Sequence, residues 1–161
     1  MRKLLSAMAV VFSTGMIGSV CAQDFEKGVR AFETGDYATA VKEWWFLAER
    51  GDAQAQVALG ARYFHGQGVI QDYKEAVKWW HRSAEGGNAS AQDNLGWMYR
   101  DGRGIIQNNV YAHVWFNIAA SNGYKGSSEQ RDETAKKMTA EEIAKAQELA
   151  RECVNKQYKG C

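Results

Sequence analysis

The sequence predicts an all-α protein, a short α-solenoid of antiparallel helix pairs with C-terminal capping helices. Two observations lead to this fold class. The 161-residue chain has 16 glycines and no proline, so helices can run unbroken between glycine turns. A 36-residue internal repeat then divides most of the chain into two-helix units. With 45% hydrophobic and 24% charged residues, the composition is that of a globular protein and argues against intrinsic disorder.

The repeat appears when the sequence is compared with itself. Residues 54–89 match residues 90–125 at 13 of 36 positions, where chance would give about two or three. The matching pairs are Ala55/Ala91, Gln56/Gln92, Leu59/Leu95, Gly60/Gly96, Tyr63/Tyr99, Gly66/Gly102, Gly68/Gly104, Ile70/Ile106, Gln71/Gln107, Ala76/Ala112, Trp79/Trp115, Ala84/Ala120 and Gly87/Gly123. A period of this length is typical of stacked helical repeats.

Each repeat is expected to begin with an amphipathic helix. Ala55, Leu59 and Tyr63 follow one another at intervals of four residues, which places them on one helix face. Gly60 in mid-helix would cost about 1 kcal/mol relative to alanine. Gly60 and its twin Gly96 are therefore predicted to be points where a neighbouring helix packs closely.

The turns are expected at glycines. Residues 66–68 and 102–104 each read Gly-x-Gly between the two helices of a repeat. A turn is expected there because glycine accepts a positive φ. Asp72, followed three residues later by Glu75, predicts a capping box at the start of the second helix. Between units a C′ glycine stands directly before an N-cap residue, in Gly51-Asp52 and in Gly87-Asn88.

Large aromatic side chains follow the same repeat. The tryptophans expected in the core between units, on the second helices, are Trp44, Trp79, Trp80 and Trp115. Trp97 differs, because it faces away from the stripe of Leu95 and Tyr99. It is expected either to line a binding groove or to pack between neighbouring helices.

The C-terminal segment has the pattern of a cap. Thr139 and Glu142 predict a capping box, and the helix that follows carries its apolar residues on one face, namely Ile143, Ala146, Ala150 and Cys153. A terminal unit needs one apolar face for the stack and one polar face for water. Cys153 and Cys161 are expected to form a disulfide if the chain is exported, with two free thiols as the alternative.

Residues 1–22 have the pattern of a secretory signal peptide. Arg2 and Lys3 precede an apolar stretch that ends in Val-Cys-Ala, so cleavage is expected after Ala22. The alternatives are a membrane anchor or a lipoprotein attached at Cys21. The mature chain would be periplasmic or secreted, without stable membrane insertion. It would keep 18 basic and 19 acidic residues, a balance that does not indicate nucleic-acid binding.

The repeated motif resembles the Sel1-like repeat, a relative of the tetratricopeptide repeat with a longer loop. The motif is Leu-Gly-x2-Tyr, then Gly-x-Gly-Val/Ile, then Asp, Ala, Trp, Ala and Gly in the order and spacing of residues 54–89. The resemblance divides the chain into a first helix pair (23–53), two full repeats (54–89 and 90–125) and capping helices with a tail (126–161). It implies a scaffold or adaptor that binds a protein or peptide in the bacterial envelope.

The resemblance also implies where a partner would bind. In tetratricopeptide-like stacks the first helix of each pair lines the concave groove, and apolar anchors among charged residues suit a peptide or a partner helix. Carried over position by position, the partner-binding groove is expected at Val29, Phe32, Val57, Ala61, Phe64, His65, Asp93, Trp97, Arg100 and Asp101.

No catalytic residue, metal site or cofactor is predicted. The three histidines lack metal-ligand spacing, the Gly-x-Gly loops lack the third glycine of a dinucleotide fingerprint, and the sequence contains neither Gly-x-Ser-x-Gly nor Ser-x-x-Lys. The expected function is the one that the resemblance implies, a noncatalytic interaction module.

Two alternatives remain open. An envelope hydrolase acting on β-lactams or peptidoglycan is one, because some cysteine-rich secreted relatives have been associated with such activities. Those relatives place a cysteine pair inside each repeat, and this chain has none there. A subunit that dimerises through its aromatic groove is the other. The sequence leaves the oligomeric state and the identity of the partner undetermined.

Overall fold

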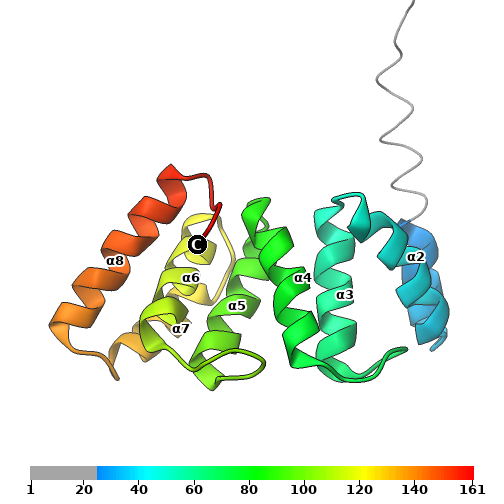
Figure 1. The fold of residues 1–161 in the computed structure, drawn as a ribbon, viewed down its shortest axis with the longest axis horizontal. Helices are drawn as coiled ribbons and strands as arrows, with labels where there is room; N and C mark the ends of the chain where they lie inside the picture. The colour runs from blue at the N-terminus through cyan, green and yellow to red at the C-terminus, as the bar shows by residue number, and fades with distance from the viewer. Residues whose placement is uncertain (1–24) are drawn as a thin grey trace, which may run out of the picture.

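The computed structural model describes residues 25–161, and the predicted signal peptide, its alternatives and Cys21 lie outside this range. The described part is all-helical (Figure 1), which confirms the predicted fold class. The helices are residues 25–33, α2 (Tyr37–Glu49), α3 (Ala53–His65), α4 (Tyr73–Glu85), α5 (Ala89–Asp101), α6 (Asn109–Ser121), α7 (Ser127–Ala135) and α8 (Ala140–Asn155). Within residues 25–161, none of the helices combines the length and the apolar character needed to cross a membrane.

The helices stack in chain order to form the solenoid. Within the repeats α3 packs on α4 and α5 on α6, and between units α2 packs on α3 and α4 on α5. Figure 1 shows the resulting row of helices, with α8 beside α6 at the C-terminal end. Because α6 contacts both α7 and α8, these two helices cap the stack as predicted.

The helix caps follow the predicted chemistry with one exception. The capping box of α8 is complete, since the Thr139 and Glu142 side chains each accept the other residue's backbone N–H. At α4, Asp72 accepts from the backbone of Glu75, but the Glu75 side chain pairs with Lys78 instead of returning a bond. That half of the predicted box is wrong, because the Asp72 N–H already donates to the Tyr63 carbonyl at 2.9 Å.

The mid-helix glycines are contact points, as predicted. A Cβ atom added to Gly60 would lie 2.4 Å from Nε1 of Trp80, and one added to Gly96 would lie 2.5 Å from Cδ1 of Phe116. Each glycine therefore lets a large aromatic residue of the following helix lie directly on the backbone of the first helix.

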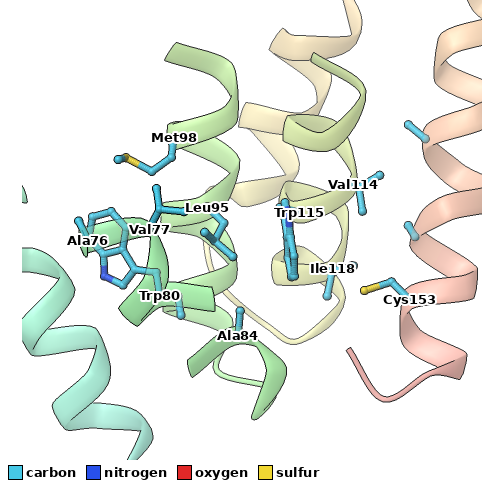
Figure 2. Packing of buried hydrophobic residues seen from close by; sticks show 13 residues of the cluster. Ala76, Val77, Trp80, Ala84, Leu95, Met98, Val114, Trp115, Ile118 and Cys153 are labelled. Atoms are coloured by element: carbon cyan, nitrogen blue, oxygen red, sulfur yellow. The ribbon is translucent and has the colours of Figure 1, made fainter. Parts of the chain in front are cut away.

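The core consists of two clusters. The larger one joins α4, α5, α6 and α8, and Figure 2 shows Leu95, Trp115 and Ile118 in it, with Cys153 of α8 pointing towards Ile118. The smaller one joins α2, α3 and α4 and includes Trp44 of α2 and Trp79 of α4. All four tryptophans predicted to be core residues are buried.

Cys153 and Cys161 form the predicted disulfide, with their Cα atoms 5.6 Å apart. The segment between them folds back onto the repeats. Tyr158 lies against Gly87 in the α4–α5 turn, and its hydroxyl donates to Oδ1 of Asn122 at 3.1 Å. The disulfide thus holds the C-terminal segment against the end of the second repeat.

Opening this loop with Cys161→Ser should lower the free energy of unfolding by about 2–3 kcal/mol, because the cross-link limits the conformations of the unfolded chain. Urea unfolding monitored by circular dichroism measures the loss. Cys153 stays in place, so the core packing is kept. Reducing the wild type with dithiothreitol should give the same loss and should not affect the variant. Equal urea midpoints for the oxidised wild type and the variant would contradict the prediction.

Candidate functional site

A pocket of about 380 Å³ lies between the first helices of the two repeats. We call it the α3–α5 pocket. It is lined by Ala61, Phe64 and His65 of α3, by Trp80 of α4, by Asn94, Trp97, Met98 and Asp101 of α5, and by Arg103 in the following loop. Its volume falls in the range typical of ligand-binding pockets, about 300–1,000 Å³.

The floor of the pocket is aromatic because of the repeat itself. Gly60 allows Trp80 to lie on α3, where its indole N–H donates to the Val57 carbonyl at 3.2 Å. The Phe64 ring packs 5.8 Å from the Trp80 ring. Ala61 occupies the position that Trp97 has in the next repeat, so its small side chain leaves space in front of these rings.

Trp97 is held in one orientation by contacts on three sides. Its indole N–H donates to Oδ2 of Asp93 at 3.1 Å, its ring meets Phe116 edge to face at 5.8 Å, and the Arg100 guanidinium lies 3.7 Å from its ring centroid. The ring is nevertheless partly exposed and lines the pocket. Trp97 is therefore packed against a neighbouring helix and also lines the pocket.

Asp93 does not present its side chain to a groove, contrary to expectation. It is only 6% exposed, and it accepts hydrogen bonds from Ser127 at the start of α7 and from Trp97. Burial raises the pKa of this carboxyl, and the two hydrogen bonds and the nearby Arg100 oppose the rise. Asp93 thus orients Trp97 and anchors the first capping helix.

The expected groove residues separate into two sets. Ala61, Phe64, His65, Trp97 and Asp101 come together around the pocket. The residues that do not line it are Val29, Phe32, Val57, Asp93 and Arg100. Arg100 turns away because it is bonded to Gln130 of α7 at 3.0 Å, and Phe32 packs on Trp44 at the N-terminal end.

Sequence reasoning missed four lining residues, Trp80, Asn94, Met98 and Arg103. Asn94 lies one helical turn before Trp97, and Met98 lies one turn before Asp101. Helical spacing from these two residues could therefore have identified them. Trp80 is a core residue, as predicted, and it also lines the pocket. Arg103 lies in a Gly-x-Gly loop, a pattern that by itself predicts only a turn.

The pocket contains apolar surface with few polar groups and shows no arrangement suited to metal binding. In the described residues no group of three or more His, Cys, Asp or Glu side chains is placed to hold a metal ion. The α3–α5 pocket can receive an apolar side chain, which would contact its fixed aromatic rings.

The stacked helix pairs and the pocket between their first helices define this protein as a short α-solenoid of the repeat-protein class. The Sel1 repeat family model matches residues 53–88 and 89–124. The chain therefore carries two Sel1 repeats.

The solved structures that are similar to it include the following two. One is a protective antigen of uropathogenic Escherichia coli strains with an SLR fold, 28% identical, with a TM-score of 0.80 over 86% of this chain. This chain spans 31% of that antigen. The other is a Sel1 repeat protein from Oxalobacter formigenes, 29% identical, with a TM-score of 0.64 over 73% of this chain and 91% of that one. No curated protein matched the chain.

Proposed function

We propose that this protein is a noncatalytic interaction module of the bacterial envelope, which binds a segment of a partner protein in the α3–α5 pocket. The observation that carries the proposal is the open, apolar pocket with Trp97 fixed at its wall. Rigid aromatic residues contribute much of the binding energy at protein interfaces, because their contact area costs little conformational entropy.

The envelope location rests on two features. The Cys153–Cys161 disulfide belongs to an oxidising compartment, and residues 1–22 have the sequence pattern of a signal peptide. Sel1 repeats are in general protein-interaction modules, which supports binding rather than catalysis. The E. coli neighbour, described as a protective antigen, is in keeping with a protein outside the cytoplasm.

Filling the pocket with Ala61→Trp tests the proposal. The equivalent position of the next repeat carries Trp97, so a tryptophan suits the helix while its ring occupies the pocket. Peptides selected by phage display on the full wild-type chain should lose affinity for the variant by about tenfold or more, which corresponds to about 1.4 kcal/mol. Fluorescence anisotropy with labelled peptides measures the loss.

The matched control is Phe46→Ala, which removes a 56% exposed aromatic side chain of α2 that is not among the pocket-lining residues. It should leave peptide binding unchanged. Circular dichroism must show equal helix content for all three proteins. Peptides that bind the Ala61→Trp variant as tightly as the wild type would refute pocket binding.

A further inference from the structure

Arg103 stands at the α3–α5 pocket without a partner carboxylate. It lines the pocket, and its guanidinium lies 5.6 Å from the Phe64 ring centroid and 5.9 Å from the Tyr73 ring centroid. Among residues 25–161, no ion pair involves Arg103. The side chain is exposed, so its N–H groups remain available to a ligand.

The acidic residue of the pocket, Asp101, already has an ion-pair partner. The Asp101 carboxylate accepts from Nε of Arg100 at 3.1 Å. Asp101 is the acidic residue among those that line the pocket, and it pairs with Arg100 rather than with Arg103.

The repeat does not require an arginine at this position. The twin residue in the preceding Gly-x-Gly loop is Gln67, and both loops adopt the same geometry, with φ of 67° at Gly66 and at Gly102. Arg103 thus adds a charge beside the pocket that the loop itself does not need.

We propose that the partner segment carries an aspartate or glutamate next to a large apolar residue. The apolar side chain fills the α3–α5 pocket, and the carboxylate pairs with Arg103. The neighbouring rings limit the orientations of the guanidinium, which can then offer two parallel N–H groups to a carboxylate. This inference rests on the proposed function and names the chemistry of its partner.

The test compares acidic and neutral versions of one peptide. Peptides are selected from a random phage library on the full wild-type chain, and the consensus peptide is synthesised with its acidic residue and with the matching amide. Arg103→Gln, which installs the residue of the twin loop, should weaken binding of the acidic peptide by about tenfold. The amide peptide should bind the wild type and Arg103→Gln equally weakly, since the energetic coupling is between the peptide carboxylate and the Arg103 guanidinium.

Arg30→Gln is the control, because it removes an exposed arginine of helix 25–33 that does not line the pocket. It should leave both peptides unaffected and so separates a local pairing from the change in net charge. Raising the salt concentration should weaken the binding of the acidic peptide more than the binding of the amide peptide.

The outcomes separate this inference from the proposed function. Some peptides could lose affinity for Ala61→Trp and yet lack an acidic residue, or bind Arg103→Gln as tightly as the wild type. Either result overturns only the acidic-partner assignment. A library that yields no peptide sensitive to Ala61→Trp overturns both. A wild-type dimer in analytical ultracentrifugation that Ala61→Trp dissociates would identify a second copy of the chain as the occupant, and would also overturn the peptide assignment.

Discussion

Trp115→Ala should lower the free energy of unfolding by about 3–5 kcal/mol, the cost of removing a large aromatic side chain from a core. Trp115 is 0% exposed. It lies in the cluster that joins α4, α5, α6 and α8 (Figure 2), and the His81 ring meets it edge to face at 5.6 Å. Urea unfolding followed by circular dichroism measures the change.

Two further variants sharpen this prediction. Trp45→Ala removes the same side chain from a 49% exposed position on α2 and should change the stability by no more than about 0.5 kcal/mol. Trp115→Phe should lower the free energy of unfolding by less than Trp115→Ala does. It keeps most of the apolar volume and removes a buried indole N–H that has no acceptor within residues 25–161. Equal losses for Trp115→Ala and Trp45→Ala would show that the cluster does not hold the stack together.

Gly104→Ala should lower the free energy of unfolding by about 2–5 kcal/mol through two separate effects. Gly104 has a φ of 69°, in the left-handed region, where a non-glycine residue costs about 1–2 kcal/mol. Its new Cβ atom would also lie 2.4 Å from the backbone carbonyl of Tyr73, which adds an overpacking cost of about 1–3 kcal/mol.

Gly123→Ala carries the backbone effect alone, so comparing the two variants isolates the packing effect. Gly123 has a φ of 86°, but an added Cβ atom would meet no atom within 4 Å. The two variants should therefore share the backbone cost and differ by the contact with Tyr73. Thermal and urea unfolding of both variants measure the difference, and identical losses would contradict the close packing of this loop on the preceding unit.

The loop contact recurs along the chain. Gly68 stands in the same relation to Tyr37 as Gly104 does to Tyr73, since an added Cβ atom would again lie 2.4 Å from a backbone carbonyl. Each Gly-x-Gly loop thus rests on the first residue of the second helix of the previous unit. The glycines predicted as turns also set the distance between units.

The helix pairs could be predicted from sequence because their causes are local. Apolar residues at helical spacing define the buried face, and a glycine followed by an N-cap residue ends one helix and begins the next. The predicted N-caps Asp52, Asp72 and Asn88 all accept backbone N–H groups in the structure. Gly60 and Gly96 were predictable as contacts because mid-helix glycine is costly without one.

The capped end of the solenoid was harder to predict from the repeat alone. A position-by-position transfer treats Asp93 and Arg100 as groove residues, since both lie on the first helix of a pair. In the structure α7 binds both of them, Asp93 through Ser127 and Arg100 through Gln130. These contacts join residues 30 or more positions apart and involve a helix outside the repeats.

By itself, then, the sequence determined the class of fold, the ends of the repeated helices and the residues that form the core between units. Those features follow from spacing and from the chemistry of individual residues within about one repeat. Only the tertiary structure decided which of the expected groove residues face one pocket and that Arg103 joins them. The physical reason is that a pocket depends on where side chains from separate helices meet, and here the non-repeating helix α7 occupies the positions that the repeat alone would leave open.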